Sequence, residues 1–129
     1  MREIIFRAKK LDTNEWIEGW YLESCFGHWP LLPSIVPCID AREGYHRAVE
    51  INRNTLGQFT GIVDKCGQRI FEGDIIKADN SHIGYVAYEY GMFIKRCKCH
   101  PNSFGSTFLG DNETVIGNIY DDSNLIWRL

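Results

Sequence analysis

The stretch Phe59-Thr-Gly-Ile-Val-Asp-Lys-Cys-Gly-Gln-Arg-Ile-Phe-Glu-Gly-Asp-Ile-Ile76 decides the fold class of this chain. Two segments rich in β-branched and aromatic residues, 59–63 and 68–76, flank a four-residue turn. The turn begins with Asp64, whose carboxylate can accept backbone N–H groups. It ends with Gly67, which supplies the positive φ of a type I turn followed by a bulge. The pattern predicts a β-hairpin at the centre of the chain.

Strand-like segments recur on both sides of this hairpin, and helical periodicity is nearly absent. Short strands are expected at residues 3–8, 16–22, 45–51, 82–90, 92–98, 114–120 and 125–128, bounded by turn residues. Residues 52–57 are expected to form a short helical turn. So many short strands in a chain of 129 residues predict a mainly β fold, an antiparallel barrel or roll with an N-terminal hairpin.

Residues 23–44 interrupt the strand pattern. Pro30, Pro33 and Pro37 fall close together here, and a proline cannot donate a hydrogen bond to a sheet. We expect a long ordered loop that is functional or connects two subdomains. The chain is therefore interpreted as one domain over residues 1–129, which can be subdivided near residue 45 into an N-terminal hairpin and loop (1–44) and a barrel core (45–129).

The composition is that of an ordinary folded protein, with 44% hydrophobic and 24% charged residues. No apolar run approaches the ~20 residues that span a bilayer. Arg7 interrupts the first apolar run, so a signal peptide is not indicated. We expect a cytoplasmic protein with no membrane partner. The net charge of −3 argues against strong non-specific attraction to nucleic acid.

The five cysteines do not suggest a disulfide framework, because their number is odd and their positions are scattered. Cys97, Cys99 and His100 could supply part of a metal site, completed by Cys66 or His82. The alternative is that Cys97 and Cys99 are two small apolar side chains on one face of a strand. The ligand set is incomplete, so we expect no metal and no cofactor.

Three pieces of the chain together resemble the YopX family, small proteins common in bacteriophages and prophages. They are the segment Arg2-Glu-Ile-Ile-Phe-Arg-Ala8 followed by Trp16, the central residues 57–76, and Val115-Ile-Gly-Asn-Ile-Tyr120 with Leu125 beyond it. Their order and spacing cover nearly the whole chain. One departure is Cys66, where the turn of the family usually has Asn.

The resemblance implies a mainly β fold with an SH3-like barrel core, encoded by a phage or an integrated element. It brings no established activity and no catalytic or binding residues. The motif positions are interpreted as turn, bulge and strand-end residues that build the fold. They are Gly61, Asp64, Gly67, Glu72, Gly73, Asp74, Gly117 and Asn118.

Three acids of the central stretch, Asp64, Glu72 and Asp74, raise the question of acid–base chemistry, since glycoside hydrolysis uses two carboxyls about 5–9 Å apart. Turn chemistry explains them better, because Asp64 would satisfy turn amides and Gly73-Asp74 would bend the chain into the next strand. No serine lies in a G-x-S-x-G elbow, and no glycine-rich phosphate loop is present. We therefore expect no enzyme and no catalytic residues.

The aromatic content of 13% favours an interaction surface. The leading hypothesis is a non-enzymatic β module that binds a protein partner or assembles into a homo-oligomer, since Tyr and Trp are enriched at interfaces. The alternative is a nucleic-acid-binding accessory protein that stacks bases on tyrosines beside a basic cluster. The residues of this surface are Tyr85, Tyr88, Tyr90, Lys95, Arg96 and Lys98.

Overall fold

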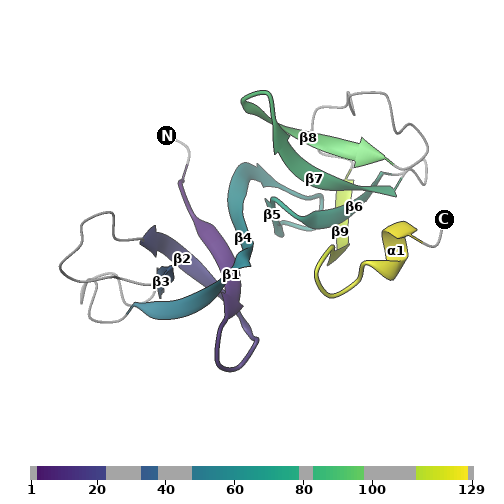
Figure 1. Cartoon of the computed structure of the whole chain (residues 1–129). Helices are drawn as coiled ribbons and strands as arrows, with labels where there is room; N and C mark the ends of the chain where they lie inside the picture. The colour runs from purple at the N-terminus through teal and green to yellow at the C-terminus, as the bar shows by residue number, and fades with distance from the viewer. Residues whose placement is uncertain (1–2, 23–32, 38–47, 79–82, 98–112, 128–129) are drawn as a thin grey trace. The chain divides into compact units, whose positions relative to one another are not determined.

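The computed structural model describes residues 3–22, 33–37, 48–78, 83–97 and 113–127 (Figure 1). The chain divides into two compact units, Met1–Phe59 and Thr60–Leu129, so the division falls inside a strand and not near residue 45. The described part is mainly β, as predicted, and its strand pairs are antiparallel. Its elements are β1 (Phe6–Lys10), β2 (Trp16–Leu22), β3 (Ser34–Pro37), β4 (Val49–Val63), β5 (Arg69–Phe71), β6 (Asp74–Ala78), β7 (Ile83–Glu89), β8 (Met92–Cys97), β9 (Glu113–Asn118) and α1 (Asn124–Trp127).

The strand pairs of the first unit form a closed set, because the last strand pairs with the first. β1 pairs with β2, β2 with β3 and β3 with the start of β4, and the following residues of β4 pair back with β1. Each strand therefore has a hydrogen-bonded neighbour on two sides, which removes the exposed edges that short strands otherwise present. The core of this unit consists of Ala8, Ile35 and Ile51, with Phe6, Ile17, Tyr21 and Leu56 packed against it.

β3 lies inside the segment for which the sequence predicts a loop, and that prediction is wrong for these four residues. Ser34, Ile35 and Val36 are buried, and Ile35 pairs with both Tyr21 and Val49. Pro37 does not interrupt the strand, because it lies beyond the two residues of β3 that pair with β4 and so has a neighbouring strand on one side only. The remaining residues of the predicted loop lie outside the described ranges.

Residues 52–57 belong to β4, so the predicted helical turn is wrong. Between the pairs Lys9↔Asn52 and Arg7↔Gly57, four residues of β4 (53–56) face one residue of β1, which is a β-bulge. Thr55 holds it: its hydroxyl accepts the Lys9 N–H at 2.8 Å and donates to the Asn52 carbonyl at 2.7 Å. Residues 52–57 do contain the polar side chains that favour a turn, but here they form a bulge in β4.

The variant Thr55→Val is expected to lower the free energy of unfolding by about 1–3 kcal/mol. It keeps the shape of the side chain but removes an acceptor and a donor from a buried site. Urea unfolding measures the loss. Thr13→Val is the matched control, because the Thr13 hydroxyl is exposed and accepts only the Glu15 N–H, at 3.3 Å. Equal losses in the two variants would show that the Thr55 hydroxyl does not hold the bulge.

The second unit contains the end of β4, β5 and a four-stranded sheet in the order β8-β7-β6-β9. The two edge strands of this sheet are joined by an ion pair. Lys95 on β8 places its Nζ 3.1 and 3.0 Å from the carboxylate oxygens of Glu113 on β9. Both side chains are buried, so the pair joins β8 and β9 within the interior of the unit. Its core consists of Ile70, Ile76 and Val86, with Ile62, Phe93 and Val115 packed against it.

Two predicted strands of this unit take a different form. Residues 68–76 form two strands, since Gly73 has a φ of 92° and the Asp74 carboxylate accepts the Phe71 N–H at 2.8 Å across the turn. The predicted strand at 125–128 is wrong, because α1 occupies this place. Asp122 precedes the helix, and its backbone carbonyl accepts the Leu125 N–H at 2.9 Å in the turn that leads into α1. Among the described residues no helix is long and apolar enough to cross a membrane.

Candidate functional site

The hairpin of β7 and β8 carries the candidate site (Figure 1). Its strands pair in register up to Glu89↔Met92, so Tyr90 and Gly91 alone make the turn. Both turn residues have positive φ, 53° for Tyr90 and 77° for Gly91. This is the type I′ geometry, whose twist matches that of the flanking strands. The turn therefore holds the end of the hairpin in one defined conformation.

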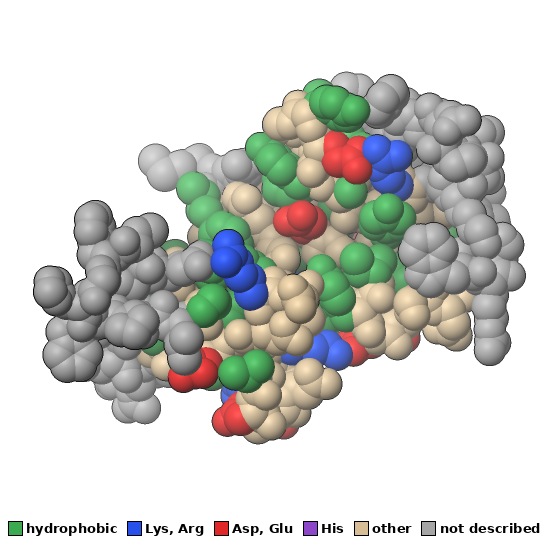
Figure 2. Space-filling model, in the orientation of Figure 1, with side chains coloured by type: hydrophobic (Ala, Val, Ile, Leu, Met, Phe, Trp, Pro, Cys, Tyr) green, Lys and Arg blue, Asp and Glu red, His purple; other side chains and the backbone are tan. Residues whose placement is uncertain are grey.

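The end of this hairpin, residues 88–93, exposes apolar side chains, and we call it the hairpin tip. Tyr88 is 52% exposed, Tyr90 78% and Met92 56%, whereas Val86 and Ile94 nearer the base are buried. Figure 2 shows hydrophobic side chains at the end of this hairpin. At ~200 Å² for each large side chain, the three present roughly 350 Å² of accessible surface. The register places Tyr88 on the face of Phe93 and Met92 on the face of Glu89, so this surface extends over both faces of the hairpin.

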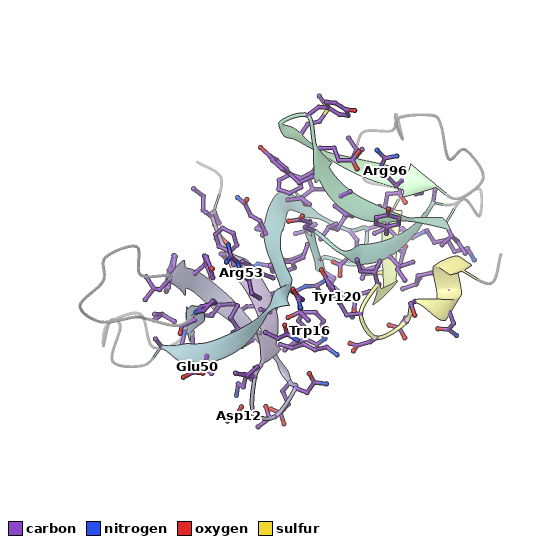
Figure 3. All side chains as sticks on the ribbon, viewed as in Figure 1. Asp12, Trp16, Glu50, Arg53, Arg96 and Tyr120 are labelled. Carbon is purple, nitrogen blue, oxygen red and sulfur yellow. The ribbon has the colours of Figure 1, made fainter. Side chains whose placement is uncertain are left out.

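Contacts on both faces of the hairpin fix the tip. On one face the rings of Tyr88 and Phe93 meet edge to face, with centroids 4.9 Å apart, and Phe93 packs against the core of the unit. On the other face Arg96, labelled in Figure 3, binds Glu89. The Arg96 Nε lies 2.8 and 3.0 Å from the two carboxylate oxygens, and its Nη2 also donates to Glu89. The tip is therefore preorganised before any partner arrives.

The Glu89–Arg96 pair also sets the charge of the surface beside the tip. Hydrogen bonding to Glu89 raises the pKa of Arg96, and the carboxylate balances the charge of the guanidinium. Both side chains remain partly exposed. The surface therefore combines aromatic and thioether groups with one neutralised ion pair.

Only part of the tyrosine and basic surface predicted from the sequence is exposed in the structure. Tyr88 and Tyr90 are exposed at the tip, and Tyr85 is half-buried opposite Arg96 in the register. Lys95 must be removed from that surface, because its side chain is 2% exposed and pairs with Glu113. Lys98 lies outside the described residues. Of the three predicted surface cations, the described residues thus contain one at the surface, Arg96, and it is bound to Glu89.

Two of the three acids of the central motif, Asp64 and Asp74, accept hydrogen bonds from backbone amides. Asp64 is buried, and its Oδ1 accepts the N–H groups of Cys66 at 2.8 Å and Gln68 at 2.9 Å, while its Oδ2 accepts that of Val115 at 3.1 Å. Asp74 is also buried and accepts the Phe71 N–H. Glu72 is half-buried in the turn between β5 and β6. These are contacts of turns and strand ends, and they link the β4–β5 hairpin to β9.

The glycine and asparagine residues of the motif lie at backbone turns and at paired strand positions of the second unit. Gly61, Gly67 and Gly73 have φ values of 89°, 86° and 92°. In the β6–β9 pairing, Gly117 faces Ile75 and Asn118 faces Asp74. The Asn118 side-chain oxygen accepts the amides of Tyr120 and Asp121 at 3.0 and 2.9 Å. The central and C-terminal motif pieces therefore meet in β6 and β9.

The predicted metal ligands lie largely beyond what the structure describes. Cys99, His100 and His82 are outside the described residues, and Cys97 is placed only as the last residue of β8. Cys66 is an exposed free thiol at the β4–β5 turn. Within the described ranges, no group of three or more His, Cys, Asp and Glu side chains could hold a metal ion.

An open pocket of about 470 Å³ lies in the first unit, between the end of β1 and the start of β4. Its described lining consists of Leu11, Asp12, Val49 and Glu50; Figure 3 labels the two acids. The Leu11 N–H donates to the Glu50 carbonyl at 3.0 Å and joins the two chain segments. Both acids of this lining are exposed to solvent.

The comparisons with known proteins identify the family. The crystal structure of protein EF1440 from Enterococcus faecalis is similar, with a TM-score of 0.61 and 23% identity over 98% of this chain and 99% of that chain, a likeness that shows the fold alone. None of the curated proteins compared with the chain matches it. The family model described as YopX protein matches residues 5–127. The chain therefore belongs to the YopX family.

Proposed function

We propose that this protein is a non-enzymatic protein-binding module and that the hairpin tip is its contact surface. The observation that carries the proposal is the exposure of Tyr88, Tyr90 and Met92 on a rigid two-residue turn. Tyrosine and methionine are enriched at protein interfaces, and tyrosines often supply most of the binding energy. A fixed turn also lowers the entropy that is lost on binding.

The charges of the described residues favour a protein partner over nucleic acid. Binding to a phosphate backbone draws its affinity from Lys and Arg side chains that neutralise phosphates. Lys95 is buried against Glu113, and Arg96 is held by Glu89. The net charge of the chain is −3. A surface of aromatic and methionine side chains with a balanced ion pair suits an apolar protein surface better.

We also propose the type of barrel, the origin of the protein and its site of action. An SH3-like barrel is proposed for the second unit, supported by its β4–β5 hairpin and by the buried ion pair of Lys95 and Glu113, which joins the two edge strands of its sheet. A phage or prophage origin is proposed from the family resemblance. The site of action is proposed to be the cytoplasm, where a host protein would be available as a partner.

A photo-crosslinking residue at position 90 is expected to capture a protein in the bacterial host. p-Benzoylphenylalanine would replace Tyr90 in the full chain, and the matched control would carry it at Val63, which is 47% exposed in the same unit. After irradiation, adducts should be several-fold more abundant for position 90, because that ring would lie in the interface. Denaturing gels and mass spectrometry measure them.

Comparison of the adduct yields at positions 90 and 63 distinguishes specific binding from random collision. Equal adduct yields at positions 90 and 63 would contradict the proposal, since both side chains are exposed to solvent. An adduct between two copies of this chain would indicate homo-oligomer formation, and light scattering of the purified protein would then show more than a monomer.

A further inference from the structure

The turn residue Tyr90 stands where local backbone physics disfavours it. The first central position of a type I′ turn needs positive φ and is normally Asn, Asp or Gly. A side chain with a Cβ pushes against the neighbouring carbonyl in this conformation, and a bulky residue there is an outlier. Tyr90 nevertheless adopts a φ of 53°. Its side chain is 78% exposed, so the core of the unit does not require a bulky residue at this position.

A strained residue on an exposed turn points to a role outside folding, because strain that folding does not need clusters at binding sites. We infer that Tyr90 is an anchor that enters an apolar groove on a different protein, and that the turn gives up stability to present it. The inference rests on the proposed function, that the hairpin tip binds protein. It adds the anchor residue and the chemistry of the partner surface.

The size of the tip favours a groove over a flat face of a second copy. Stable interfaces bury about 800 Å² on each partner, and the three exposed side chains of the tip present less than half of that. A flat contact through the tip alone would therefore be weak. A groove that encloses both sides of the hairpin also buries its flanks, so that a small projecting element reaches the area that binding needs.

The chemistry of the tip defines the walls and the rim of this groove. Tyr88, Tyr90 and Met92 require apolar walls, because none carries a charge. A buried phenol hydroxyl usually has a hydrogen-bond partner, so the groove would be polar or open to solvent where it meets the hydroxyl of Tyr90. Glu89 and Arg96 satisfy each other and remain partly exposed, so they would meet a polar rim without requiring a net charge on the partner.

The variant Tyr90→Asn in the full chain tests strain and binding together. Asparagine tolerates the turn conformation, so the melting temperature is expected to rise by about 2–5 °C. Affinity for the protein captured by crosslinking at position 90, purified and titrated against each variant, is expected to fall at least about tenfold, as for loss of a central anchor. Tyr90→Phe keeps the ring and should retain most of the affinity. Val63→Asn is the control, with an unchanged affinity.

The outcomes are distinguishable from those of the proposed function. Preferential capture at position 90 of a different protein, with the adduct on apolar residues that line a groove, supports the inference. A lower melting temperature for Tyr90→Asn would overturn it, because the turn would then not be strained. Capture of a second copy of this chain, or Tyr90-dependent binding of a labelled single-stranded DNA, would also overturn it. Absence of preferential capture would refute the proposed function itself, whichever way the melting temperature moves.

Discussion

Replacing Lys95 or Glu113 alone is expected to lower the free energy of unfolding by about 3–5 kcal/mol, a large part of the stability of a small domain. The two side chains are 2% and 7% exposed, and Nζ lies 3.1 and 3.0 Å from the two carboxylate oxygens. In Lys95→Met the Glu113 carboxylate stays buried without its cation, and in Glu113→Leu the ammonium group stays buried without its anion. A charge left in this position costs several kcal/mol of desolvation.

The surrounding backbone is shaped to hold the lysine. A Cβ on Gly84 would lie 2.9 Å from the Lys95 Cγ and 2.5 Å from the Arg96 carbonyl oxygen, so a larger residue at position 84 would displace the aliphatic part of Lys95. Across the register Lys95 faces Val86, a core residue. The stem thus crosses the apolar interior and the ammonium group reaches β9, where Glu113 balances it.

The double variant Lys95→Met/Glu113→Leu is expected to recover most of the loss, because it removes both charges and fills the site with apolar atoms of similar volume. Urea unfolding of the four proteins in a double-mutant cycle gives the coupling energy. Lys77→Met, on the exposed position of β6, serves as the control and should change stability by about 0.5 kcal/mol or less. Additive losses in the double variant would contradict a specific buried pair.

Local patterns predict the central hairpin and most strands well, because the chemistry that sets them lies within a few residues. The strand predicted over 16–22 has the bounds of β2, and Gly67 of the predicted turn has a positive φ. The elements that were missed depend on distant partners. β3 exists because β2 and β4 lie on either side of it, and the three residues between Pro33 and Pro37 carry no such information.

The candidate site shows the same limit. Tyr88 and Tyr90 could be singled out from the sequence because they are aromatic and close to a turn glycine. The burial of Lys95 could not, since lysine is among the least buried residues and its partner is 18 residues away on another strand. A weak signal existed in β8, where Lys95 alternates with Phe93 on the face that packs against the core. The pairing of Glu89 with Arg96 likewise required the register of the hairpin.

Replacing Asp64 by alanine is expected to lower the free energy of unfolding by about 2–4 kcal/mol, because several backbone N–H groups lose their acceptor at once. Two of these groups belong to the β4–β5 turn and the third, from Val115, belongs to β9. The side chain therefore fixes a turn and also ties it to a strand 51 residues away in the sequence. Urea unfolding measures the loss, and Asp12→Asn, at an exposed position, is the control.

The same carboxylate should make stability depend on pH in a defined direction. Burial raises the pKa of Asp64, but hydrogen bonds from the amides of Val115, Gln68, Cys66 and Gly67 outweigh it and hold the pKa below its ordinary value of 3.8. In that case the unfolded chain binds the proton more readily than the folded one, so the stabilisation is complete above the unfolded pKa of about 4 and is lost as the pH falls through the lowered folded pKa.

The variant Asp64→Asn separates this charge effect from the hydrogen bonds that a neutral side chain can keep. Its carbonyl oxygen can still accept the Cys66 and Gln68 amides, but its amide group cannot accept that of Val115, so its stability near pH 7 should lie between those of wild type and Asp64→Ala. The gap between wild type and Asp64→Asn should narrow as the pH falls from about 4 towards 2, because protonation removes the negative charge from the wild-type side chain as well. A gap that stays constant over this range would mean that Asp64 acts only through the shape of its hydrogen bonds. A narrowing gap would show that its charge helps to hold the β4–β5 turn against β9.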